Sequence, residues 1–414
     1  MTGVSESPRV LELFAGAGGM AIGLADAGFR HVALLEKDPN AVATLQANAA
    51  SGSGVTPDIS IESLDVHSFE YEAISPEIAV LAAGAPCQPF SLAGNHLGDE
   101  DNRNLFPEVF RAQRALLPRA VFLENVWGLA RTSFRPYLEY LLLQLALPYM
   151  PARRNELWAA HRRRLKAEAG RDRGSTEPSY DVHIAAIDCA NFGVPQRRNR
   201  LFVVAFRSDL DVTWKWPKAS YGEDALLFAK YTCGSYWREH GVRPRLASRI
   251  PQQASLFTSH GTKRWRTVRD VLRDLPPPVL QGAAQPYHPN HYRIDGCRQY
   301  RGHTGSTMDQ PAKTLKAGVH GVPGGENMIR FSNGVLRYFT LHESALLQTF
   351  PSDYVFRGTR SAAIRQIGNA APAEVVRLLG ILIRRLLGQA GAAGCSRFRT
   401  PHVDLVDGAA LVQL

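Results

Sequence analysis

The sequence predicts an α/β protein in which an open, mostly parallel sheet is accompanied by a second, smaller and irregular domain. Apolar runs of strand length recur at short intervals in the first third of the chain, and several end in polar residues suited to binding a ligand. A glycine-rich turn joins the first run to a helix of small and apolar residues. The chain has 414 residues, more than a single hydrophobic core usually holds, so two domains are expected.

Composition limits the classes of function. Hydrophobic residues make up 45% and charged residues 21% of the chain, as in ordinary soluble globular proteins. We find no signal-peptide pattern and no apolar run long enough to cross a bilayer, and therefore expect a cytoplasmic protein that does not bind membranes. The five cysteines include no Cys-x-x-Cys pair, and His288 and His291 lack partner cysteines, so no metal is expected.

The net charge of +10 favours a polyanionic partner. Much of the excess lies in residues 151–173, where eight Lys/Arg and three Asp/Glu give 8 − 3 = +5. We interpret this segment as a solvated basic helix, although it could also contribute to binding a polyanion.

The first two strands predict a site for a nucleoside-containing cofactor. An apolar strand over Val10–Phe14 leads into a turn with Gly16, Gly18 and Gly19, and a helix follows. The second strand, 31–38, delivers Glu36 twenty residues after Gly16, which is the spacing for a carboxylate that binds ribose hydroxyls.

Three further strands are predicted, and each ends in residues with useful chemistry. The strand over 59–66 ends at Asp65, a candidate acceptor for an adenine amino group. The strand over 78–87 ends at Cys87, which lies between two prolines. The strand over 119–128 ends at Glu124 and Asn125. In an open parallel sheet, ligands bind outside the carboxyl ends of the strands, so we expect these residues to converge on one rim.

A hairpin of two strands, Val182–Asp188 and Leu201–Phe206, is predicted after the basic segment. Arg198 and Arg200 alternate before its second strand, so we expect both guanidiniums on one face, suited to a carbonyl oxygen, a carboxylate or phosphates. Cys189, beside the hairpin, is expected to be structural.

Strand and helix periodicity are weak from residue 208 to about 331. Tryptophans there alternate with basic residues, and we expect most of these tryptophans to fill a small core. A helix capped near Thr340 and a final helix, Ala373–Leu387, which returns to the first domain, follow.

The chain resembles the DNA (cytosine-5)-methyltransferases of bacterial, restriction-modification type. The matching blocks appear in the family's order and are LELFAGAGGMAIGL, EKD at 36–38, GAPCQPFSLAG, ENV at 124–126, VPQRRNR, RYFTLHESALLQTFP at 337–351 and QIGNAAPAEVV at 366–376. Ala85 stands where the family often has another Gly or Pro, a small departure.

The resemblance implies a Rossmann-like, S-adenosylmethionine-dependent methyltransferase domain that releases S-adenosyl-L-homocysteine. Cys87 would add to C6 of a flipped cytosine, Glu124 would act at N3, Arg200 would bind O2, and Arg198 would hold neighbouring carboxylates or phosphates. The residues implied for the cofactor are Phe14, Gly16, Gly18, Gly19, Glu36, Asp65, Pro86 and Asn369. Those implied for DNA are Gln88, Ser91, Asn125 and Gln196.

The expected organisation follows from the same resemblance. Residues 1–207 and 362–390 would form the catalytic domain, 208–361 a target-recognition domain with a connecting helix, and 391–414 a tail without an assigned role. The expected partner is double-stranded DNA in the nucleoid. A cognate restriction endonuclease that acts separately is a further possible partner. We expect a monomer. Two alternatives remain open: a cytosine-5 methyltransferase of tRNA, and a catalytically inactive DNA-binding paralogue.

Overall fold

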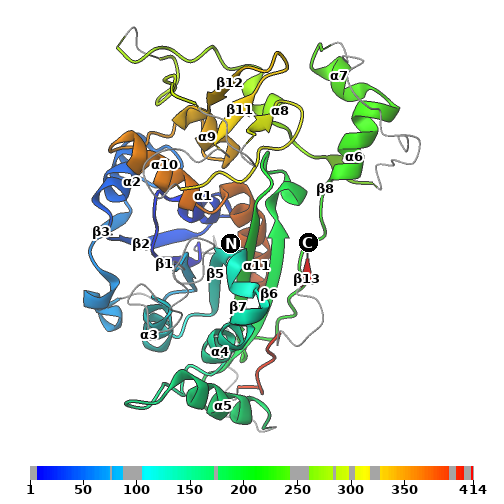
Figure 1. Cartoon of the computed structure of the whole chain (residues 1–414). Helices are drawn as coiled ribbons and strands as arrows, with labels where there is room; N and C mark the ends of the chain where they lie inside the picture. Colours follow the sequence, from blue (N-terminus) through cyan, green and yellow to red (C-terminus); the bar gives the residue numbers. More distant parts are fainter. Residues whose placement is uncertain are drawn as a thin grey trace, which may run out of the picture.

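The computed structural model describes residues 7–74, 77–86, 105–171, 176–242, 261–282, 286–297, 304–317, 327–390, 398–404 and 412–413. Its centre is an eight-stranded sheet in the order β13-β6-β7-β5-β4-β1-β2-β3 (Figure 1). The strands are β1 (Arg9–Leu13), β2 (Arg30–Glu36), β3 (Ser60–Ser63), β4 (Val80–Ala83), β5 (Ala120–Val126), β6 (Tyr180–Asp188), β7 (Asn199–Arg207) and β13 (Val412–Gln413).

The first five strands are parallel to one another, as the sequence predicts. Both faces of such a sheet are covered, which explains why β4 is apolar and buried at every residue. β7 lies antiparallel between β5 and β6, so the predicted hairpin is confirmed. The third strand is shorter than expected, because β3 ends at Ser63 and Asp65 instead caps a 3-10 turn over Val66–Ser68.

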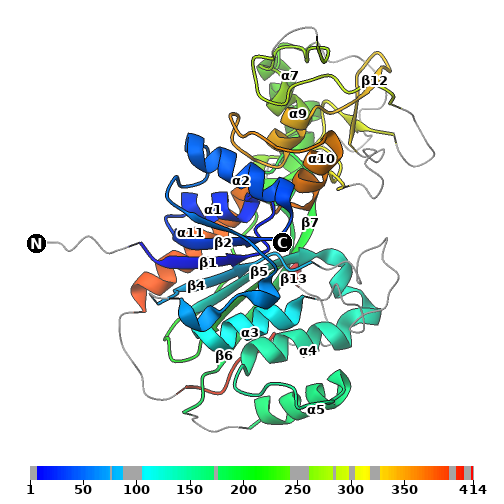
Figure 2. The ribbon, with the colours of Figure 1, turned by 90° about the vertical axis from the view of Figure 1, so that its left-hand side faces the viewer.

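Helices cover both faces of the sheet. On one face lie α1 (Gly19–Asp26), α2 (Pro39–Ser51) and α11 (Ala373–Gln389), and on the other lie α3 (Phe106–Leu116) and α4 (Arg135–Ala146), with α5 (Trp158–Ala169) outside α4 (Figure 2). α11 packs on α1 and on the sheet, as predicted for the final helix. The contact is so close that a Cβ atom at Gly23 would come within 2.5 Å of the carbonyl oxygen of Ala373, so this position requires glycine.

The remaining part of the chain is built from short elements. These are β8 (Tyr221–Gly222), α6 (Glu223–Leu227), a π-helix (Phe228–Thr232), α7 (Ser235–Glu239), β9 (Lys263–Arg264), α8 (Val268–Leu272), β10 (Ser306–Thr307), β11 (Met328–Arg330), β12 (Leu336–Tyr338), α9 (Leu341–Leu347) and α10 (Arg360–Asn369). Elements this short explain the weak periodicity of the sequence. The predicted cap is confirmed, since Thr340 and Glu343 form a capping box at α9.

The tryptophans of this region divide between two cores. Trp265 is buried and Trp237 half-buried in a small core around Tyr236, as expected, but these are two of four and not most of the tryptophans. Trp214 and Trp216 pack instead on the large core between the sheet and α11. We therefore call residues 217–361 the second part, because the chain still belongs to the sheet part up to Trp216.

The basic segment and the tail both pack on the sheet part. Helix α5 is tied to α4 by ion pairs from Arg162 and Lys166 to Glu139, so part of its positive charge is neutralised. The tail adds β13 to the edge strand β6. Among the described helices, none combines the length and the apolar character that a membrane span requires.

Candidate active site

The carboxyl ends of β5, β4, β1, β2 and β3 lie next to one another in that order. The strand order reverses between β1 and β4, and such a reversal is where open α/β sheets bind ligands. The two strand ends are adjacent. A Cβ atom placed at Gly84 would have the carbonyl oxygen of Phe14 as its nearest neighbour, 4.0 Å away.

Glu36 organises the glycine-rich turn after β1. Its Oε2 accepts a hydrogen bond from the backbone N–H of Gly16 at 2.7 Å, and its Oε1 accepts from Lys37 and Asp38 at 2.8 Å each. Phe14, which is not glycine, takes a positive φ of 58° in this turn. Such strain in an L-residue is typical of functional sites.

The three glycines of the turn differ in their surroundings. A Cβ atom at Gly16 would meet no described heavy atom within 4 Å, so this position faces open space. A Cβ atom at Gly18 would lie 2.9 Å from Leu45, and one at Gly19 would lie 2.4 Å from the carbonyl oxygen of Ala371. The missing side chains of Gly18 and Gly19 therefore serve the packing of α1 against its neighbours.

Asp65 lies beyond the end of β3, with its side chain 42% exposed. The ammonium of Lys37, 2.9 Å away, and the ring of His67, 2.6 Å away, hold the pKa of this carboxyl well below its usual range. Asp65 is thus a charged acceptor near the end of β2. Asn369, at the end of α10, is exposed.

Asn125 holds the segment that leads into Cys87. Its Nδ2 donates to the carbonyl oxygen of Ala85 at 3.1 Å, and its Oδ1 accepts from the N–H of Val126 at 2.8 Å. The chain is described up to Pro86, and Cys87, Gln88 and Ser91 lie outside the described residues.

Glu124 and Arg200 form an ion pair on neighbouring strands. Arg200 lies opposite Val126 in the antiparallel ladder, so its side chain reaches diagonally to Glu124 on the same face. Arg200 Nε lies 2.8 Å from Glu124 Oε1, and both side chains are about nine-tenths buried, with 12% and 9% exposed. The N–H does not point at that oxygen, so Oε1 is a buried acceptor without a hydrogen bond among the described residues.

Two predicted site residues are structural, and their assignments are corrected here. The guanidinium of Arg198 is fully buried and donates to the carbonyl oxygens of Leu315, Gly368 and Ala370, so it is not available to hold carboxylates or phosphates. Gln196 is also fully buried, and its Oε1 accepts from the N–H of Leu315 at 2.8 Å. Gln196 is therefore not available to DNA.

Sequence reasoning missed one contributor to the glycine-rich turn. The hydroxyl of Tyr354, a buried residue between α9 and α10, donates to the carbonyl oxygen of Ala17 at 2.6 Å. No local signal marks this residue, because its partner lies 337 positions earlier in the chain.

Sequence comparisons agree with this geometry. The family model described as C-5 cytosine-specific DNA methylase matches residues 8–146 and 175–384. The type II methyltransferase M.Eco47II of Escherichia coli is 31% identical over 386 residues, which cover 91% of this chain and 79% of that protein. The type II methyltransferase M.PspPI of Psychrobacter sp. (strain TA137) is 30% identical over 391 residues, covering 93% and 81%.

Solved structures support the fold. A mutant of Spodoptera frugiperda DNMT2 superposes with a TM-score of 0.53 at 15% identity, covering 92% of this chain and 100% of that chain. The S. pombe Dnmt2 methyltransferase gives 0.52 at 18% identity, covering 93% and 99%. The family match spans most of the chain, and both type II relatives align over nine-tenths of it. The chain therefore belongs to the C-5 cytosine-specific DNA methylase family and is a DNA (cytosine-5)-methyltransferase that uses S-adenosylmethionine as methyl donor.

Proposed function

We propose that the target is a cytosine flipped out of a specific double-stranded DNA sequence, and that the reaction runs through a covalent bond between the Cys87 sulfur and C6 of the base. Flipping is required because a base inside a duplex hides C6 from any thiol. The observation that carries the proposal is the Glu124–Arg200 pair, 2.8 Å apart and largely buried. Glu124 lies on β5, and Asn125 of the same strand holds the segment leading into Cys87.

The residues around the strand reversal fit S-adenosylmethionine. Glu36 lies where the ribose hydroxyls would bind, and its carboxylate oxygens keep further lone pairs beside their three N–H contacts. Gly16 leaves open space above the turn, and Asp65 provides a charged acceptor for the adenine amino group. We also assign Phe14, Pro86 and Asn369 to this site. When bound, S-adenosylmethionine supplies an electrophilic methyl group.

The chain's own groups account for the activation of C5. The Cys87 thiolate adds to C6, and the ring electrons displaced from the C5–C6 bond make C5 a carbon nucleophile. After the methyl group has bonded to C5, a base takes the C5 proton. The C5–C6 double bond then re-forms and the thiolate leaves C6, so the enzyme is regenerated.

Glu124 and Arg200 would separate to receive the base. Arg200 would donate to O2 of the cytosine, and the Glu124 carboxyl, whose Oε1 has no hydrogen bond among the described residues, would donate a proton to N3. Both contacts withdraw electrons from C6 and so favour attack by the thiolate. Asn125 would keep Ala85 and Pro86 in place while the neighbouring cysteine reacts.

A mechanism-based adduct tests the proposal. A target 5-fluorocytosine should trap the enzyme after methyl transfer, because fluorine cannot leave C5 as a cation. We expect a complex that survives denaturation and forms only with S-adenosylmethionine. Cys87→Ser should form none, since a hydroxyl is a far poorer nucleophile than a thiolate.

The other cysteines supply matched controls. Cys233→Ser is the sharpest, because this thiol is exposed and a hydrogen bond from Ser235 lowers its pKa. Cys189→Ser is a second control, since burial raises the pKa of that thiol to about 12. Both variants should still form the adduct, as should Cys297→Ser and Cys395→Ser. An adduct in Cys87→Ser, or its loss in a control, would place the nucleophile elsewhere.

A methylation assay with duplex DNA and with tRNA checks the substrate. We expect methyl transfer to duplex DNA and none to tRNA, and any transfer also rules out an inactive paralogue. We assign target recognition to the second part, within the expected range 208–361, with base contacts expected within 285–335. Bisulfite sequencing of plasmid DNA from expressing cells would identify the recognised sequence. A separate endonuclease, a monomeric state and a location at the nucleoid stay predictions.

A further inference from the structure

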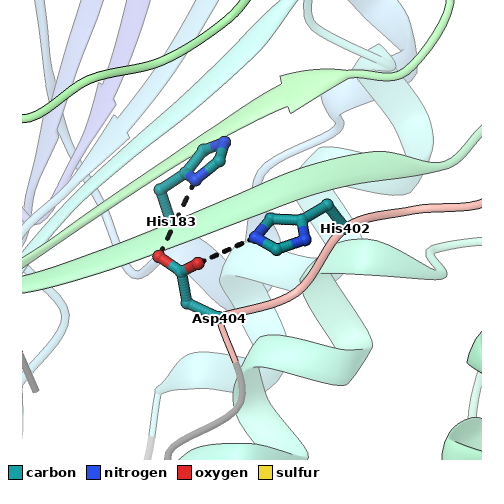
Figure 3. Close-up of side chains that lie close together, drawn as sticks. All are labelled: His183, His402 and Asp404. Atoms are coloured by element: carbon teal, nitrogen blue, oxygen red, sulfur yellow. Dashed lines mark hydrogen bonds and ion pairs between the residues drawn. The ribbon is translucent and has the colours of Figure 1, made fainter. Parts of the chain in front are cut away.

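A cluster of two histidines and an aspartate lies where the tail runs beside β6. The backbone N–H of Val182 donates to the carbonyl oxygen of His402 at 2.7 Å, and the N–H of Asp404 donates to the carbonyl oxygen of Val182 at 3.0 Å. Val182 and Val403 form a parallel bridge. Side chains alternate along strands, so Val182 and Val403 pack toward the core while His183, His402 and Asp404 share the other face (Figure 3).

The three side chains point toward one another (Figure 3). His402 Nε2 lies 2.9 Å from Asp404 Oδ1, and His183 Nδ1 lies 3.7 Å from Asp404 Oδ2. One ligand atom from each residue can be chosen so that all lie within 4.8 Å of one another. Ligand atoms around a tetrahedral Zn²⁺ with bonds of about 2.0–2.1 Å are separated by about 3.4 Å. Small side-chain rotations would bring the cluster to that spacing.

A backbone group holds the Asp404 carboxylate in place. The Ile184 N–H donates to Oδ2 at 3.1 Å. A hydrogen bond of this kind orients a ligating carboxylate.

The backbone around His402 is also held, while its ring is accessible. The His402 N–H donates to Asp181 Oδ1 at 2.7 Å, and Arg399 Nη2 lies 3.3 Å from Asp181 Oδ2. The side chain of His402 is 64% exposed and that of Asp404 33% exposed, whereas that of His183 is only 16% exposed. An ion can therefore enter from solvent, and water can complete its coordination.

We propose that His183, His402 and Asp404 form a binding site for one divalent transition-metal ion, best suited to Zn²⁺, which ties the tail to the edge strand β6. Two imidazoles and one carboxylate are a usual donor set for zinc. The expectation of no metal rested on the spacing of cysteines and histidines along the chain. That spacing does not reveal ligands brought together by the pairing of two distant segments.

A second group in the described chain serves as the control. Glu239, His240 and Asp270 also offer three ligand atoms within 4.8 Å of one another. Both carboxylate oxygens of Asp270, however, accept hydrogen bonds from Arg264 at 2.8 Å. A guanidinium in that position excludes a second cation, so this group should not bind zinc.

Titration of the full chain with Zn²⁺ tests the site. The protein, purified without a histidine tag and freed of metal with a chelator, should bind one equivalent by calorimetry. His402→Ala and Asp404→Asn should weaken binding about tenfold or more, and His240→Ala should leave it unchanged. Zn²⁺ should also slow tryptic cleavage after Arg399 in the wild type but not in His402→Ala.

Because His402 is exposed, its replacement should not disturb the fold, and circular dichroism can verify this. Equal Zn²⁺ affinity in His402→Ala and in the wild type would overturn the proposal. Failure of the wild type to bind Zn²⁺ would also overturn the proposal. The three side chains would then be joined only by the contacts of Asp404 with the two histidines. The methyl transfer reaction takes no part in this test.

Discussion

The sheet part and the second part differ in the size of their apolar cores. In the sheet part, Val121, Phe122 and Val204 are fully removed from solvent, and apolar packing on both faces dominates. In the second part, paired charges recur: Arg264 donates to both carboxylate oxygens of Asp270, and similar pairs are Arg269–Asp309 and Arg337–Glu343. Directed polar contacts secure short elements that have little apolar surface to bury.

The largest effect is expected from exchanging the second part. Replacing residues 217–336 by the matching segment of a relative should change the methylated sequence completely and leave C5 of cytosine as the target. We begin the exchange after Trp216, because the preceding residues pack on the sheet part. Bisulfite sequencing reads out the result. Persistence of the original sequence would show that base recognition lies outside the exchanged segment.

A core truncation in the sheet part should cost the most stability. Phe122 is 0% exposed and stacks on Phe202, with ring centroids 5.9 Å apart. Phe122→Ala should lower the free energy of unfolding by about 3–5 kcal/mol, and Phe122→Leu by considerably less. Urea denaturation measures both. Equal losses in the two variants would mean that cavity formation is not the cause.

The sequence predicts features that depend on local patterns better than features that depend on contacts between distant residues. The strands, the Thr340 cap and the final helix carry local patterns, so they were predictable. The roles of Arg198 and Gln196 were not, because an arginine bound to distant carbonyl oxygens has the same local pattern as one on a surface strand. The partner of Gln196 at Leu315 lies 119 residues away. Only the folded chain identifies such partners.

Cofactor affinity should depend mainly on the sheet part. Glu36→Ala should weaken S-adenosylmethionine binding by about 1.5–3 kcal/mol, as expected for hydrogen bonds to a charged group, and DNA binding without cofactor should hardly change. Calorimetry with each ligand measures the two effects. Unchanged cofactor affinity would remove Glu36 from the site.

The smallest effect should come from a charge pair of the second part. The pKa of Asp270 is about 2, because its contacts with Arg264 and Thr267 outweigh the rise that burial causes. Such a carboxylate stabilises the fold above the unfolded pKa of about 3.9, and the contribution is lost as the pH falls from about 4 to 2. Asp270→Asn should therefore cost about 1–2 kcal/mol at pH 7, after allowance for solvent screening.

Urea titrations at pH 7, 5 and 4 would follow this difference between Asp270→Asn and the wild type. The difference should stay constant from pH 7 to 5 and begin to shrink at pH 4. A difference that grew on acidification would contradict the assigned pKa shift. Phe122→Ala is the control, since its cost should not depend on the charge of Asp270.

The tail has a consequence for the solubility of the protein. The sheet ends on one side in β3, a strand of only four residues that includes the charged Glu62. On the other side β6 has nine residues, and β13 and the bridge from Val182 to Val403 cover part of its outer edge. A long bare edge offers unpaired N–H and C=O groups to a neighbouring molecule. A chain cut before Phe398 would expose that edge, and its first defect would be aggregation at high concentration, with every catalytic residue still present.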